Sequence, residues 1–211
     1  MILEACVETL EQCIEAQKRG ADRIELCDDL AQDGLTPSRE LIKRAVEQLD
    51  IPIRVMIRPR PGDFVYSQGE IEEMKIAIDF CKSVGAEGVV FGACTKAKTL
   101  DLSIIGELAK HAFPLKVTVH KAIDTCHDPV EELKHLKELG TIDAVLTSGK
   151  ELTAIGGKEC LKAMVIMAED QIEVIACGKV THENLTIVHE LIGAKAYHGK
   201  RIVSGLERET P

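Results

Sequence analysis

The sequence contains no tryptophan, and only 3% of its 211 residues are aromatic. It also has a deficit of basic residues, with 26 Lys and Arg against 35 Asp and Glu, for a net charge of −9. A general nucleic-acid surface needs clustered cations, so we expect no nucleic-acid partner. No apolar run approaches the roughly 20 residues of a membrane span, and we expect no membrane partner. The opening residues lack the basic and apolar regions of a signal peptide, which predicts a cytoplasmic protein.

The chain has eight cysteines but no Cys-x-x-Cys pair. The absence of that spacing argues against a zinc knuckle, whose ligands come as closely spaced pairs. Thiols in the cytoplasm are kept reduced, so we expect these cysteines to be free rather than joined in a disulfide framework.

Four glycines each end a helical pattern and lead into an apolar run: Gly20, Gly85, Gly140 and Gly193. Glycine just past a helix adopts the left-handed C-terminal cap without strain. The last three are 55 and 53 residues apart, which leaves room for two strand-plus-helix units in each interval. A chain of this length is most simply a single domain covering residues 1–211.

Eight apolar runs are expected to be strands, near residues 2–7, 22–27, 53–58, 87–92, 115–120, 142–147, 172–177 and 195–198. Amphipathic stretches such as 70–82 and 128–139 lie between them, and this alternation predicts a parallel α/β fold. Proline in the first turn is expected to mark helix starts at Thr36-Pro37 and Asp128-Pro129. Eight units, with no Gly-x-Gly-x-x-Gly after the first strand, favour a TIM (β/α)8-like barrel over a doubly wound sheet.

The last of these strands is followed by only 13 residues without a helical stripe, so the eighth helix should be short or missing. The flank left uncovered would be closed either by the C-terminal tail or by another subunit. We therefore expect a homo-oligomer.

Two similar triplets, Glu4-Ala5-Cys6 and Glu25-Leu26-Cys27, lie in apolar runs on the first two strands. Residues two apart in a strand share a face, so each carboxylate points the same way as its cysteine. An outward carboxylate would enter the apolar helix layer at a high cost in free energy. We expect all four side chains to point into the barrel.

Polar residues at later strand ends extend this set, because active sites of such barrels lie at the carboxyl ends of the strands. Glu4, Glu25, Arg58 and His120 are predicted to form one cluster. In an enzyme, one carboxylate would act as general base, His120 as acid or base, and Arg58 with Arg60 as an anion clamp. Alternatively, the glutamates only tie the barrel together by pairing with Arg54 or Arg58.

Three loop residues complete the candidate set. Asp124 could orient His120, line the mouth or cap its own loop. Thr147 and Ser148 follow the sixth strand and could offer hydroxyl and backbone N–H groups to an anion. The long connection 58–67 is either a lid over the mouth or a stiff turn packed on Phe64.

The two inward cysteines offer a further chemistry. Neighbouring strands lie about 4.8 Å apart, so Cys6 and Cys27 could bind a soft monovalent metal such as Cu(I) through thiolates. They could also form a disulfide or remain two unconnected core thiols. His198, at the end of the last strand, is expected to reach the mouth.

Several motifs resemble the CutC copper homeostasis family over nearly the whole chain: Glu4-x-Cys6, Ala21-Asp22-Arg23-Ile24-Glu25-Leu26-Cys27, Gly34-Leu35-Thr36-Pro37-Ser38, Ile57-Arg58-Pro59-Arg60-x-Gly62-Asp63-Phe64-x-Tyr66-Ser67, Val117-Thr118-x-His120 and Leu146-Thr147-Ser148-Gly149. The resemblance implies a cytoplasmic TIM barrel that handles copper, with Cys6 and Cys27 as Cu(I) ligands. The chain departs from the family pattern at Lys121 and Lys179, where an anion site could be altered.

Two functions follow as hypotheses. The first is a copper homeostasis protein that binds Cu(I) at the barrel mouth. The second is an enzyme on a small anionic metabolite, such as a phosphorylated one, with Glu and His as acid and base. The partner is accordingly a copper ion or a small anion.

Overall fold

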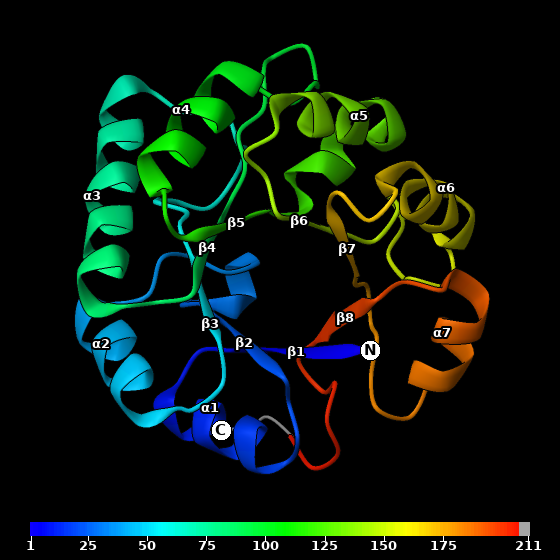
Figure 1. The fold of residues 1–211 in the computed structure, drawn as a ribbon, viewed down its shortest axis with the longest axis horizontal. Helices are drawn as coiled ribbons and strands as arrows, with labels where there is room; N and C mark the ends of the chain where they lie inside the picture. The colour runs from blue at the N-terminus through cyan, green and yellow to red at the C-terminus, as the bar shows by residue number, and fades with distance from the viewer. Residues whose placement is uncertain (207–211) are drawn as a thin grey trace.

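The eight expected strands form one closed parallel barrel, in the order β1 to β8, with β8 paired back to β1. A computed structural model of the protein describes residues 1–206. Figure 1 shows the strands as an inner ring surrounded by the helices. The strands are β1 Ile2–Val7, β2 Arg23–Leu26, β3 Ile53–Met56, β4 Gly88–Phe91, β5 Lys116–Val119, β6 Ala144–Thr147, β7 Glu173–Ala176 and β8 Ala196–Gly199. The TIM-barrel prediction is confirmed.

Seven α-helices lie outside this ring within residues 1–206: α1 Leu10–Lys18, α2 Arg39–Gln48, α3 Gln68–Val84, α4 Leu102–Ala112, α5 Pro129–Leu139, α6 Lys158–Ala168 and α7 Leu185–Ile192. Two short 3-10 helices, η1 Leu30–Gln32 and η2 Lys121–Thr125, follow β2 and β5. None of these helices is both long and apolar enough to cross a bilayer.

The ends of the helices follow the expected local signals, with one exception. Gly85, Gly140 and Gly193 cap α3, α5 and α7 in the left-handed conformation, and α5 begins at Pro129 after an Asp128 cap. The predicted start of α2 at Thr36-Pro37 is wrong, because Ser38 caps that helix. Thr36 instead exchanges two hydrogen bonds with the backbone of Arg58, which hold it to the end of β3.

An eighth α-helix is missing from the described part of the chain, as expected. The segment 200–206 takes its place: Ile202, Val203 and Leu206 are buried in the main hydrophobic core. Arg19, just after α1, donates a hydrogen bond to the carbonyl of Ser204. Figure 1 shows this red segment leaving β8 and running toward α1. The tail therefore covers the flank within one chain.

Strand register places the polar residues of the first two strands on the inner face of the barrel. Glu4 is the register partner of Arg23, and Cys6 is the partner of Glu25. All four are buried, with at most 6% of any one exposed. The apolar residues between them, such as Ala5 and Ile24, belong to the core between strands and helices. Alternation along the strand is what points the charges inward.

Candidate functional site

Toward the amino ends of the strands, the barrel interior holds an ion-pair network around Glu4, which we call the lower layer. Arg23 Nε lies 2.5 Å from Glu4 Oε2, and Arg23 also donates to Glu173 at 2.8 Å. The other Glu4 oxygen lies 2.9 Å from His198 Nδ1. Burial opposes ionisation of Glu4, but the hydrogen bond from His198 and the charge of Arg23 outweigh it and lower its pKa to about 2. Glu4 is a structural anion.

Glu4 thus forms an ion pair that links strands of the barrel, as in the alternative to a catalytic cluster, but its partner is not one of the two arginines expected. Arg23 rather than Arg54 or Arg58 forms the direct pair. Arg54 donates to Glu87 at 2.9 Å and to Thr118 at 2.8 Å, which continues the network toward β5. These charged side chains fill the lower barrel, so the space available to a ligand lies above them.

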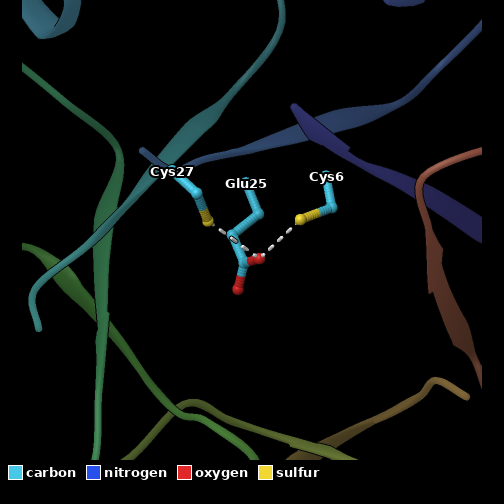
Figure 2. Close-up of side chains that lie close together, drawn as sticks. All are labelled: Cys6, Glu25 and Cys27. Carbon is cyan, nitrogen blue, oxygen red and sulfur yellow. Dashed lines mark hydrogen bonds between the residues drawn. The ribbon is translucent and has the colours of Figure 1, made fainter. Parts of the chain in front are cut away.

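Above this layer, two thiols converge on one carboxylate oxygen. Cys6 Sγ lies 3.3 Å and Cys27 Sγ 3.4 Å from Glu25 Oε2. Figure 2 shows the two sulfurs approaching that oxygen from either side. His198 Nε2 lies 3.7 Å from the same atom. One ligand atom from each of Cys6, Glu25 and Cys27 fits within 4.8 Å of the others, a spacing that a single metal ion could bridge.

The two thiols have opposite acidities. A hydrogen bond from Cys27, supported by the charge of His198, lowers the pKa of Cys6 well below its usual value despite burial. The same bond, together with burial, raises the pKa of Cys27. Although burial disfavours a charged imidazole, Glu25 and Cys6 raise the pKa of His198. Of the two thiols, Cys6 is therefore the more acidic.

Glu25 behaves differently from Glu4. Its pKa is raised well above the usual value, because burial outweighs the favourable charge of His198. Its second oxygen, Oε1, is buried and has no hydrogen-bond partner among the described residues. The raised pKa favours the protonated form of this carboxyl group.

Cys6, Glu25 and His198 line a cavity of about 980 Å³ at the carboxyl ends of the strands, together with Arg58 and His120. Cys27 is fully buried and does not line it. Glu4 does not line it. The predicted cluster is thus split: three of its members share the cavity, while Glu4 belongs to the layer underneath.

His120 is a neutral imidazole with a fixed tautomer. Its Nδ1 accepts a hydrogen bond from the backbone N–H of Ala122 at 3.1 Å, so the proton resides on Nε2. Burial and the charge of Arg58 lower its pKa to about 3. Gly92 makes room for the ring, since a Cβ at that position would lie 2.7 Å from Nδ1. Nε2 is buried without a partner among the described residues.

The two arginines expected to clamp an anion are occupied by the loop 58–67 and its surroundings. Arg58 donates to the carbonyls of Gln32, Gly34 and Gly62, the shortest at 2.7 Å. It also lies over the ring of Phe64, which packs 4.8 Å from the His120 ring. These contacts favour the stiff turn over the lid.

Arg60 makes a short ion pair with Glu70 and a second ion pair with Asp63. It also donates to the carbonyl of Val65 at 2.8 Å. These bonds use its guanidinium to hold the loop in shape, and Arg60 does not line the cavity. The terminal guanidinium nitrogens of Arg58 and Arg60 are therefore used within the loop and its surroundings, whereas the buried Nε of Arg58 has no partner among the described residues.

Asp124 holds the loop after β6 and makes no hydrogen bond to His120. It accepts from Thr147 Oγ1 at 2.5 Å, from Ser148 N and Oγ at 2.9 and 3.0 Å, and from Lys150 N at 3.1 Å. The donors predicted to bind an external anion at Thr147 and Ser148 are thus directed to this carboxylate. Asp124 lies at the cavity wall, and Ala122 N rather than Asp124 orients His120.

Sequence reasoning missed several residues that matter here. Arg23 shares the inward face of Glu25 by strand parity, and that signal was available. Lys200 and Arg201 also line the cavity, as does Lys179, which the sequence had already marked as a departure from the family pattern. Each follows β7 or β8 within three residues, so their position directly after a strand was the signal.

The CutC family model matches residues 1–203. A CutC family protein from Pasteurella multocida is 41% identical over 198 residues, which cover 94% of this chain and 81% of the relative. The human copper homeostasis protein cutC homolog is 41% identical over 197 residues, covering 93% and 72%. The crystal structure of the CutC protein from Streptococcus agalactiae superposes with a TM-score of 0.90 at 32% identity, over 96% of this chain and all of that one. The chain belongs to the CutC family.

Proposed function

We propose that this protein is a cytoplasmic copper homeostasis protein that binds Cu(I) through Cys6 and Cys27. The observation that carries the proposal is the convergence of both sulfurs on Glu25 Oε2, with Cys6 and Glu25 also lining an open cavity. A relative with 41% identity carries copper homeostasis in its name. Copper is the cargo in this proposal.

The donor set fits Cu(I). Thiolates are the soft ligands that select this ion, and the pKa of Cys6 is already lowered by its neighbours. Binding of Cu(I) to both sulfurs as thiolates would release the thiol protons to bulk water. Both cysteines are free, and both are buried, which protects a bound Cu(I) from oxidation.

A competition titration tests the proposal. The reduced protein is titrated with Cu(I) against a chelator of known affinity, beside the Cys6→Ser/Cys27→Ser double variant. Cys177→Ser is the matched control, because Cys177 lines the same cavity outside the metal group and burial raises its pKa to about 12. We expect tight binding of one ion per chain in the wild type and the control, and its loss in the double variant. Weak binding, or binding that survives the double substitution, contradicts the proposal.

A second candidate function is an enzyme acting on a small anionic metabolite. The observation that favours it is the presence of three buried polar atoms without partners among the described residues, Glu25 Oε1, Arg58 Nε and His120 Nε2, in residues that line one cavity. Glu25 would serve as the base and His120 as a hydrogen-bond donor to the substrate. Thermal-unfolding screens of chelator-treated protein with small anions test it: stabilisation lost in Glu25→Gln supports it, and its absence contradicts it.

The homo-oligomer also remains a prediction. The flank without an eighth helix, which led us to expect an oligomer, is covered by residues 200–206 of the same chain. Light scattering coupled to size-exclusion chromatography measures the state directly: a mass of 23.1 kDa would contradict the oligomer.

A further inference from the structure

Three basic side chains from two loops gather on one side of the cavity rim. Lys179 follows β7 by three residues, and Lys200 and Arg201 directly follow β8, the neighbouring strand. All three line the cavity and are exposed at its mouth. Lys200 Nζ donates to the carbonyl of Leu30 at 3.1 Å, which holds this ammonium over the mouth while leaving it further donor capacity.

The backbone around these residues adds to the positive potential. The helix α7 begins at Leu185, and Asn184 and Thr181 ahead of it line the same cavity. The amino end of a helix carries partial positive charge. In TIM barrels, the loops after the seventh and eighth strands are the frequent place for a phosphate. The three cations and the amino end of α7 therefore lie on the same side of the cavity.

The local charge balance contrasts with that of the whole chain. Five basic side chains line the cavity against four acidic ones, whereas the chain carries 26 against 35. The acids are Glu25 on β2, Asp124 in its loop, and Asp33 and Glu183 nearer the rim. Of the five cations, Arg58 donates from both terminal nitrogens to backbone carbonyls, and its Nε is buried without a partner among the described residues. The cations available to an anion are therefore Lys179, Lys200 and Arg201 on the β7–β8 side. The fifth cation is Lys121 of η2.

His120 offers a second, uncharged contact in the same cavity. Only 4% of it is exposed, its tautomer is set by Ala122, and its Nε2–H lacks a partner among the described residues. A buried donor without an acceptor has a cost in free energy that a ligand oxygen would remove. The ligand should thus carry an uncharged acceptor as well as an anionic group.

We propose that the cavity binds a small phosphorylated compound, with its phosphate held by Lys179, Lys200 and Arg201 and a carbonyl or hydroxyl oxygen accepting from His120 Nε2. Three cations match a phosphate dianion better than a carboxylate monoanion. The inference deepens the second candidate function, since it names the substrate class of the same cavity. It relocates the anion site from Arg58 and Arg60 and does not depend on Cu(I) binding.

The phosphate part is tested with inorganic phosphate, by isothermal titration of chelator-treated protein at constant ionic strength. The test variant is Lys179→Gln/Arg201→Gln, which neutralises two exposed residues and leaves the core intact. Lys43→Gln/Lys110→Gln is the matched control, because both lysines are exposed on α2 and α4 and neither lines the cavity. We expect at least a tenfold loss of affinity in the test variant only. Absence of binding to the wild type, or equal binding to both variants, overturns the proposal.

The His120 part is tested by comparing inorganic phosphate with dihydroxyacetone phosphate, a small phosphate that carries a carbonyl. We expect the carbonyl compound to bind several-fold more tightly than phosphate, and His120→Asn to remove this advantage while phosphate affinity stays unchanged. An unchanged advantage in the variant, or no advantage in the wild type, overturns this contact. Because binding is measured, a lack of turnover would contradict only the enzyme hypothesis, and a failed copper titration would leave this result standing.

Discussion

Glu4 on β1 and Arg23 on β2 are register partners whose side chains form an ion pair at 2.5 Å inside the barrel. Their side chains are 2% and 6% exposed. Each has a second partner: His198 binds the other oxygen of Glu4, and Glu173 binds the guanidinium. The pair therefore links β1, β2, β7 and β8 beneath the cavity.

Arg23→Met should destabilise the fold strongly, because it removes the direct ion-pair partner of the buried Glu4 carboxylate. We expect a loss of roughly 3–5 kcal/mol in the free energy of unfolding, measured in urea. Lys43→Met, which breaks an exposed pair with Glu47, should change stability by less than about 0.5 kcal/mol. Adding Glu4→Leu to Arg23→Met should recover part of the loss. An equal effect of Arg23→Met and Lys43→Met would show that the pair is not important.

Glu25→Gln should weaken Cu(I) binding without abolishing it. Glu25 lies between both sulfurs and favours the arrangement in which they face one ion. Neighbours that orient metal ligands typically contribute about tenfold or more in affinity. We therefore expect a loss of about tenfold in the chelator competition, against complete loss for the two cysteine substitutions. Loss as complete as in the cysteine variant would instead make Glu25 a principal ligand.

The contribution of His120 to stability should fall as the pH falls from 7.5 to 5. Burial and Arg58 lower its pKa from 6.5 to about 3, so the unfolded chain binds a proton in this range that the folded protein does not. The contribution lost by pH 5 is about 2 kcal/mol. His120→Asn should flatten the dependence of the unfolding free energy on pH by that amount, measured in urea at each pH. His127→Asn, at an exposed residue, is the control, and identical profiles for wild type and His120→Asn would contradict the assignment.

Ile202→Ala should show that the tail replaces the missing helix. Ile202 is fully buried in the core, and truncating a buried isoleucine costs about 2–5 kcal/mol. The free energy of unfolding in guanidinium should drop by that amount. Ile166→Ala on α6, where 76% of the residue is exposed, should have little effect. A small effect at Ile202 would mean that the tail does not stabilise the barrel.

Asp124→Ala should loosen the loop after β6. Four hydrogen bonds from Thr147, Ser148 and Lys150 lose their acceptor. We expect a loss of roughly 2–4 kcal/mol in unfolding free energy and faster amide hydrogen exchange at Ser148 and Lys150. Glu151→Ala, at an exposed residue of the same loop, should leave both unchanged. If exchange at Ser148 stays slow in Asp124→Ala, the carboxylate does not hold this loop.

The alternation of strands and helices and the glycine caps could be predicted from the sequence alone. So could the inward direction of Glu4, Cys6, Glu25 and Cys27. These features depend on local rules: the period of two along a strand, the period of 3.6 along a helix, and the backbone freedom of glycine. Even the absent eighth helix could be predicted, because 13 residues without a helical stripe follow the last expected strand.

The hydrogen-bond and ion-pair partners of the polar groups, in contrast, became known only from the three-dimensional arrangement. Arg23 rather than Arg54 or Arg58 faces Glu4 because the register of β1 and β2 aligns them. Arg58 is directed to loop carbonyls, and Asp124 to Thr147 and Ser148, because loops from different strands come together at the mouth. Such partners are distant in the chain, and their pairing depends on the stagger with which the barrel closes. Local periodicity does not specify that stagger. The fold could therefore be predicted from the sequence, whereas the pairing of polar side chains in the site could not.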